Sequence, residues 1–117
     1  MTAFPGYHGR RFSSNAPETA AGGETPVGHY HQSGDLVWAE FSGGAVRVGR
    51  LVGQCDPDGI LTAGYAQVLA DGTTVVGELV TTPSVLPDGR LRLREQWHRI
   101  DGSRGESWIE EIRTPRG

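Results

Sequence analysis

Residues 86–99 read LPDGRLRLREQWHR and contain, one after the other, a tight turn and an alternating strand. The Asp88-Gly89 pair is typical of hairpin turns, because glycine adopts the positive φ angles that such turns require. After the turn, arginines alternate with leucines at a period of two, which is the pattern of a β-strand with one buried face. The stretch therefore predicts a hairpin turn followed by a strand over 90–99.

Turns of the same kind divide the rest of the chain. Hydrophobic residues make up 36% of the sequence and there are 18 glycines, many in turn-like clusters, which favours short strands over long helices. The other turns are expected at 32–35, 42–44, 56–59, 70–73 and 101–105. The segments between the turns are rich in β-branched and aromatic residues and predict strands near 7–13, 24–32, 35–42, 45–54, 60–70, 73–82, 90–99 and 106–113.

These segments predict an all-β fold, an antiparallel up-and-down meander of about eight strands. An open meander would leave two exposed edges, and closure into a small barrel removes them. A barrel of this size is just wide enough inside to hold one small ligand. We expect a single β-barrel domain, 1–117, with a mobile loop near 14–23 and a frayed tail at 114–117.

The composition excludes several classes of function. A formal net charge of −3 gives neither the basic footprint of a nucleic-acid-binding protein nor a polybasic segment for anionic membranes. All 11 cationic residues are arginines, so a lysine Schiff base is excluded. Cys55 is the one cysteine, and we expect it to be a structural thiol. No membrane span, signal peptide or cofactor motif is recognisable, so we expect a cytoplasmic protein without a cofactor.

The strand at 90–99 places a carboxyl group inside the predicted barrel. Its arginines mark the solvent face, so Glu95 lies on the inward face between Leu93 and Trp97. An inward carboxylate is costly unless it is paired, hydrogen-bonded or protonated. Glu95 is therefore the leading candidate for a ligand site, and a structural partnership with an inward Arg, Tyr or Trp is the alternative.

Two other strands offer polar groups to the lumen. In 60–70, Tyr65 and Gln67 share a face with leucines, so we expect both to point inward. In 73–82, Glu78 lies between two valines, which predicts a second inward carboxylate.

The alternation is ambiguous in the two strands before them. In 45–54, one face combines Arg47 with two glycines that leave room for a ligand, so that Arg47 would bind an anion; the rival face carries Arg50. In 35–42, both faces carry apolar residues, and the inward or outward direction of Trp38 stays open.

The segment His29-Tyr30-His31 raises the question of a metal site. Two histidines at i and i+2 share one face of a strand and can chelate zinc. No third ligand lies at a suitable spacing, so we favour solvated histidines and expect no metal. The sequence also contains no nucleophile elbow and no phosphate-binding loop.

Several stretches between His29 and Glu111 match a group of short bacterial proteins. They are 29–35 (HYHQSGD), 37–39 (VWA), 42–44 (SGG), 86–93 (LPDGRLRL) with Glu95 and Trp97, and 109–111 (IEE). The chain resembles this group over about two thirds of its length, and its members often carry the label acetylglutamate synthase-like. The resemblance carries over no catalytic residue. The predicted architecture is also similar to small barrels of the avidin and lipocalin type.

We therefore expect a small-molecule-binding barrel with an aromatic and polar lumen. Its partner would be a small, partly apolar molecule, and neither nucleic acid nor a membrane. A homo-oligomer is also expected, because small barrels with exposed apolar outer strands tend to associate. The candidate ligand-binding residues are Trp97, Trp38, Tyr30, Arg47, Gln67 and Glu78.

Two alternatives stay open. One is a cofactor-free cyclase or isomerase, for example of secondary metabolism, in which Glu95 and Tyr65 are the catalytic residues and transfer protons. The other is an oligomerisation module whose lumen is filled by its own side chains. The volume of the lumen separates the module from the first two. A Glu95→Gln variant, which should spare binding but stop proton transfer, separates the enzyme from the binding protein.

Overall fold

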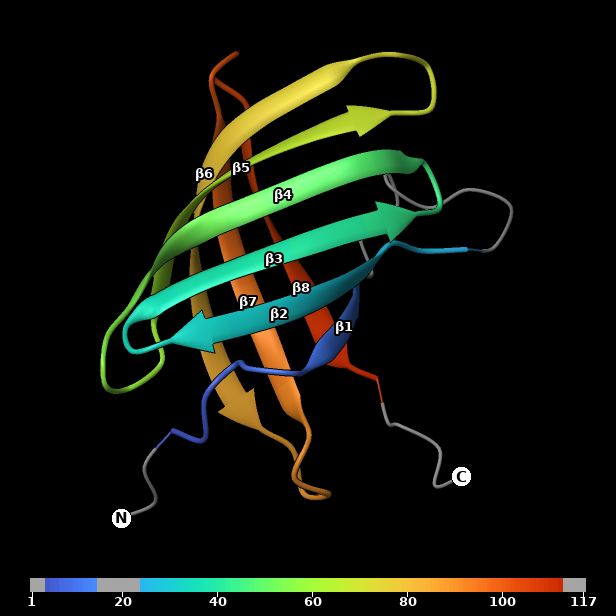
Figure 1. Cartoon of the computed structure of the whole chain (residues 1–117). Helices are drawn as coiled ribbons and strands as arrows, with labels where there is room; N and C mark the ends of the chain where they lie inside the picture. The colour runs from blue at the N-terminus through green and yellow to red at the C-terminus, as the bar shows by residue number, and fades with distance from the viewer. Residues whose placement is uncertain (1–3, 15–23, 113–117) are drawn as a thin grey trace.

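Eight β-strands form a closed antiparallel barrel in the computed structural model, which describes residues 4–14 and 24–112 (Figure 1). The strands are β1 (Arg11–Ser14), β2 (Val27–Ser33), β3 (Leu36–Gly43), β4 (Val46–Cys55), β5 (Leu61–Leu69), β6 (Thr74–Val85), β7 (Leu91–Arg99) and β8 (Arg104–Glu111). Each strand pairs with the next one in the sequence, and β1 pairs with β8. The predicted all-β meander and its closure are confirmed.

The described residues contain no helix that is long and apolar enough to cross a membrane. Apart from Ser14, which ends β1, the predicted mobile loop near 14–23 lies outside the described residues. The predicted tail at 114–117 lies outside them as well.

The first strand departs most from its predicted limits. It begins at Arg11 instead of residue 7, because residues 7–10 form a turn. The N–H of Arg10 donates to the carbonyl of Tyr7 at 3.2 Å, and the N–H of Gly9 donates to the carbonyl of Tyr30 at 2.9 Å. These bonds direct the chain before β1 into the end of the barrel.

Strand β6 continues through Pro83, beyond its predicted end at residue 82. Proline has no N–H, so a strand accepts it where no neighbouring strand needs that donor. Pairing between β5 and β6 stops at Thr81, and from there onward β6 pairs with β7 alone. Pro83 therefore lies where one side of β6 is an unpaired edge.

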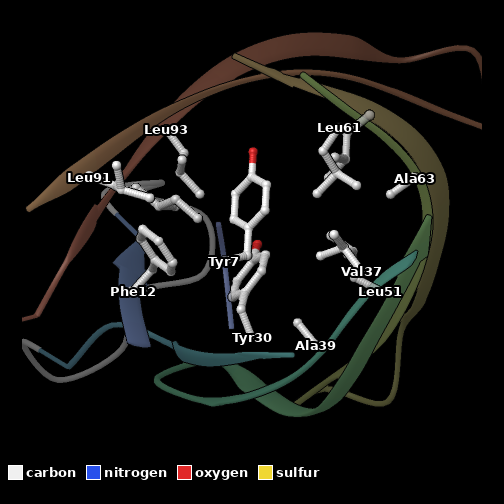
Figure 2. Packing of buried hydrophobic residues seen from close by; sticks show 12 residues of the cluster. Tyr7, Phe12, Tyr30, Val37, Ala39, Leu51, Leu61, Ala63, Leu91 and Leu93 are labelled. Carbon is white, nitrogen blue, oxygen red and sulfur yellow. The ribbon is translucent and has the colours of Figure 1, made fainter. Parts of the chain in front are cut away.

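Inward side chains fill one end of the barrel. The largest fully buried ones are Tyr7, Phe12, Leu61, Leu91, Leu93, Val37 and Thr81. Figure 2 shows Tyr7 and Tyr30 at the centre of the lumen, with Leu91 and Leu93 toward one wall and Leu61 toward the other. This packed layer is the core of the protein.

A β-bulge decides which face of β4 points inward. The pairing between β4 and β5 shifts its register between Val46 and Val48, so the strict alternation of the strand is broken there. Val46 is buried, as are Gly49 and Leu51, although simple alternation would put Val46 on the opposite face. Arg47 is consequently exposed, and so is the rival Arg50.

Candidate functional site

One end of the lumen is packed, and the other contains a cavity of about 110 Å³. Ser14, Gln67 and Arg99 lie at or near the carboxyl ends of β1, β5 and β7, and all of them line the cavity. Because the odd-numbered strands of an antiparallel meander run in one direction, the cavity opens at the barrel end that these strands reach. Its lining consists of Phe12, Ser14, Pro26, Gly28, Tyr30, Phe41, Leu51, Tyr65, Gln67, Leu79, Glu95, Trp97, Arg99, Ser107 and Ile109.

The opposite end is closed by residues 4–10, which we call the N-terminal plug. Tyr7 is fully buried, and its hydroxyl donates a hydrogen bond to the carbonyl of Gly59. The N–H of Tyr7 donates to Oε1 of Gln32 at 2.8 Å, and the ring of Phe4 packs on the Tyr7 ring with centroids 4.9 Å apart. The plug therefore separates the cavity from this end of the barrel.

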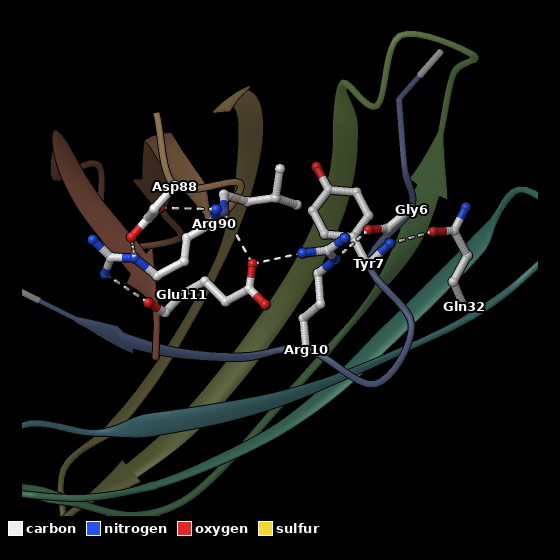
Figure 3. Close-up of polar contacts among 8 residues, drawn as sticks. Gly6, Tyr7, Arg10, Gln32, Asp88, Arg90 and Glu111 are labelled. Atoms are coloured by element: carbon white, nitrogen blue, oxygen red, sulfur yellow. Dashed lines mark hydrogen bonds and ion pairs between the residues drawn. The ribbon is translucent and has the colours of Figure 1, made fainter. Parts of the chain in front are cut away.

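An ion pair holds the plug against the barrel wall (Figure 3). Nη1 of Arg10 lies 2.6 Å from Oε1 of Glu111, and the same oxygen accepts a hydrogen bond from the N–H of Leu91 at 3.0 Å. Nε of Arg10 also donates to the carbonyl of Gly6 at 2.9 Å. Because both charged groups are largely removed from solvent, salt screens this pair less than an exposed one.

Glu95 lies between the packed core and the cavity, on the inward face that the alternation predicted. Its paired residues on the two adjacent strands are Thr81 on β6 and Ser107 on β8. Among the described residues, none donates a hydrogen bond to the Glu95 carboxylate and none forms an ion pair with it. Part of the side chain is accessible from the cavity. Burial inside the barrel nevertheless disfavours the charged form and raises the pKa of Glu95 to about 7.

Tyr30 projects from β2 into the same region. Its ring packs edge-on against Phe12 with centroids 5.0 Å apart, and it stacks on Tyr7 at 5.8 Å. Burial, followed by the negative charge of Glu95, raises the pKa of Tyr30 well above its ordinary value. Tyr30 therefore stays a neutral phenol, able to donate a hydrogen bond beside the carboxylate.

The mouth of the cavity combines aromatic rings with one cation. The guanidinium of Arg99 lies over the Trp97 ring, 4.3 Å from its centroid, and Nε of Arg99 donates to the Tyr65 hydroxyl at 3.4 Å. The amide of the buried Gln67 lies further along β5. The mouth thus offers rings for stacking and several hydrogen-bonding groups.

Glycines opposite the rings shape this part of the lumen. Phe41 lies over Gly49, and a Cβ on that glycine would come within 2.1 Å of the ring. The pair of Trp97 and Gly105 repeats the arrangement, with a clash at 2.4 Å. Each ring can lie flat along the wall because the facing residue has no side chain, so the rings line the cavity instead of blocking it.

The predicted site residues divide into two groups. Glu95, Tyr65, Trp97, Tyr30 and Gln67 line the cavity.

Trp38, Arg47 and Glu78 do not line the cavity and lie on the outside of the barrel. The prediction of an inward Glu78 is wrong, and the directions that the alternation left open for Trp38 and Arg47 are outward. Trp38 is 40% exposed and stacks on His31. Arg47 is turned outward by the bulge in β4. Glu78 is outward because its neighbour Leu79 faces the core, which leaves the flanking valines on the surface.

Several cavity residues were missed. Phe12, Phe41 and Ser107 come from strands whose inward face the sequence did not decide. Arg99 was within reach, because the alternation that placed Glu95 and Trp97 inside continues to the end of β7. It was missed because the other arginines of this segment all lie on the outer face.

The histidines and the cysteine take part in local contacts on other parts of the barrel. Nε2 of His31 lies 2.9 Å from Oε1 of Glu40, and His29 is exposed. Nε2 of Gln32 donates to Sγ of Cys55 at 3.2 Å, and burial raises the pKa of that thiol. No three His, Cys, Asp or Glu side chains of the described residues come close enough to hold a metal ion.

A second depression, of about 840 Å³, lies beside the turn between β7 and β8. It is lined by surface residues such as His98, Arg104 and Glu106, and it is open to solvent over most of its extent. A small ligand there would bury little of its surface, so the cavity in the lumen is the better candidate site.

A model of the avidin-like protein family matches residues 5–112. The chain belongs to this avidin-like family. The match spans all eight strands and the whole lining of the cavity, and it confirms the predicted similarity to avidin-type barrels. The label acetylglutamate synthase-like finds no support in an avidin-like barrel without helices among its described residues. Neither the curated proteins nor the solved structures gave a significant match.

Proposed function

We propose that the avidin-like barrel binds a small, partly apolar molecule in its lumen. The observation that carries the proposal is the cavity of about 110 Å³, which is closed at one end by the N-terminal plug and lined by rings and a few polar groups. Preformed concave sites of this composition are typical of small-molecule binding. The cavity also disfavours an oligomerisation module, whose lumen would be filled by its own side chains.

The lining residues would make two kinds of contact with the ligand. The rings of Phe41, Trp97 and Tyr30 would bury the apolar body of the ligand. Gln67 and Glu95 would fix its orientation, because a ligand that left these polar groups unpaired would bind more weakly.

A cofactor-free enzyme is the second candidate, and the pKa of Glu95 favours it. A carboxyl group with a pKa of about 7 exists in both protonation states at neutral pH, which suits a general acid or base. In an isomerase, Glu95 would take a proton from one atom of the substrate and return it to another. The Tyr65 hydroxyl, at the mouth, would hold the substrate by a hydrogen bond.

The binding proposal is tested by filling the cavity. Ser107 lines it, and Ser107→Leu introduces an apolar side chain into the space. Ser42→Leu makes the same change at an exposed position of β3 and is the matched control. The three proteins are compared in a ligand-observed NMR screen of small aromatic and alicyclic compounds. We expect some compounds to bind both the wild type and Ser42→Leu but not Ser107→Leu. A screen without binders, or binders indifferent to Ser107→Leu, would contradict the proposal.

We also propose that copies of the chain associate through the outer face of β3–β6. This face carries exposed Leu36, Trp38, Val48, Val52, Val76 and Val80. Trp38 and Val52 are direct cross-strand neighbours there, and the next residue in the same row is Gly64, which leaves the surface flat. An outer face on which these apolar side chains lie beside the exposed Arg50 and Glu78 is suited to a second copy of the same face.

A further inference from the structure

Two charged residues line the cavity among the described residues, and both belong to β7. Glu95 lies next to the packed core, and Arg99 ends the strand at the mouth. At the rise of a β-strand their α-carbons lie about 13 Å apart. The cavity therefore has a negative inner end and a positive rim.

The cation at the rim does not neutralise the anion inside. Arg99 lies over Trp97 and donates to Tyr65, both near the mouth. The pKa of Glu95 is raised by burial, and no positive charge of the described residues lowers it. The inner end of the cavity thus holds a carboxyl group whose ionised form has no countercharge within residues 4–14 and 24–112.

Aromatic rings line the same cavity as this group. Tyr30 lies close enough for the charge of Glu95 to affect its pKa, and Trp97 is the next inward residue on the same strand. Phe12 packs against Tyr30 and also lines the cavity. The faces of such rings carry negative electrostatic potential and attract cations.

We propose that the ligand carries a protonated amine, which pairs with the Glu95 carboxylate while the apolar body lies among the rings of the cavity. This inference rests on the proposed binding function and names the chemical class of its ligand. An organic ammonium ion supplies the charge that the carboxylate lacks, donates hydrogen bonds to it, and is held by the ring faces. An anionic ligand would instead face a like charge in surroundings of low dielectric constant.

The test compares three probes of similar shape, benzylamine, benzyl alcohol and benzoate. Isothermal titration calorimetry is carried out at about pH 8, where a group with a pKa of about 7 is mostly ionised. We expect benzylamine to bind most tightly. Glu95→Gln should weaken benzylamine binding on the order of 30-fold and leave benzyl alcohol nearly unchanged. Glu78→Gln, on the outside of the neighbouring strand β6, is the matched control and should bind as the wild type does.

A second measurement needs no variant. Between about pH 5.5 and 8 the affinity of the wild type for benzylamine should rise, because Glu95 ionises over this range while the amine stays protonated. A ligand that accepts a hydrogen bond from the neutral acid would show the opposite trend.

The outcomes separate this inference from the function on which it rests. If benzyl alcohol or benzoate binds in the lumen as tightly as benzylamine, the proposed binding function holds and the proposed amine ligand is wrong. Unchanged benzylamine affinity in Glu95→Gln would equally overturn it. If none of the probes binds and the Ser107→Leu screen also finds no lumen ligand, both proposals fail.

Discussion

Thr81 lies directly opposite Glu95 across the pair of β6 and β7, and both side chains point into the barrel. The Thr81 side chain is completely buried, and its hydroxyl has no hydrogen-bond partner among the described residues. Two neighbouring polar groups at the inner end of the lumen thus both lack a partner, which is costly in a folded protein. Unpaired buried polar groups occur at functional sites of proteins, and this pair therefore supports the proposed ligand site.

Replacing Thr81 by Val should stabilise the free protein. The change removes an unsatisfied buried hydroxyl and leaves a methyl group of almost the same size, so we expect the free energy of unfolding to rise by about 1 kcal/mol. Thr62→Val, at an exposed position of β5, is the control and should change it little. Urea denaturation measures both, and a loss of stability in Thr81→Val would mean that the hydroxyl binds Glu95 in solution.

The ionisation of Glu95 should destabilise the fold at higher pH. Burial raises its pKa from 4.5 to about 7, so the folded protein holds a proton that the unfolded chain releases. The resulting loss in the free energy of unfolding is absent below about pH 4.5, grows as the pH rises toward 7 and is complete above it, where it reaches up to about 3 kcal/mol.

The side chain of Glu95→Gln cannot ionise, so the free energy of unfolding of this variant should not fall in the same way as the pH rises. We expect the variant to match the wild type near pH 4.5 and to be more stable at about pH 8, as followed by thermal melts across this range. A variant less stable than the wild type at pH 8 would indicate a structural hydrogen-bond network around Glu95 instead.

The N-terminal plug should depend on one hydroxyl. Tyr7→Phe removes the hydrogen bond to the Gly59 carbonyl while keeping the ring, and we expect a loss of about 1 kcal/mol in the free energy of unfolding. Tyr65→Phe is the comparison, because its hydroxyl makes a long contact of 3.4 Å at the half-buried mouth and should matter less. Equal effects of the two changes in chemical denaturation would argue against a special role for the plug.

The outer face of β3–β6 predicts the oligomeric state. We expect light scattering at micromolar concentration to report a dimer or larger assembly, and Val52→Glu, at a position 67% exposed, to convert it to a monomer. Val85→Glu is the control, because Val85 is 61% exposed but lies in the part of β6 that pairs with β7 alone. A wild-type monomer would disprove the interface, and so would an assembly unaffected by Val52→Glu.

The sequence predicted the inside of β7 well and that of β4 and β6 badly, for physical reasons. Arg92 and Arg94 mark the solvent face of β7, so Glu95 and Trp97 had to point inward. On β4 a bulge breaks the alternation, and no single residue type marks it beforehand. On β6 exposed valines resemble a core face, which made Glu78 look buried.

The plug could not be predicted from local pattern at all. Its key contact joins Tyr7 to Gly59, which belong to segments distant in the sequence that meet only when the barrel closes. The cavity has the same origin, since its lining is assembled from the strands around the barrel.

Because Tyr7 closes one end of the lumen, the proposed binding site is a blind-ended tube, which would give a bound ligand a fixed direction. A ligand of the proposed site would enter and leave by the same mouth, with one end leading and the other trailing past Arg99. Chemical extensions on the trailing end would project into solvent, whereas the leading end has no room to grow. A tether or dye attached to the trailing end should therefore be carried without loss of affinity.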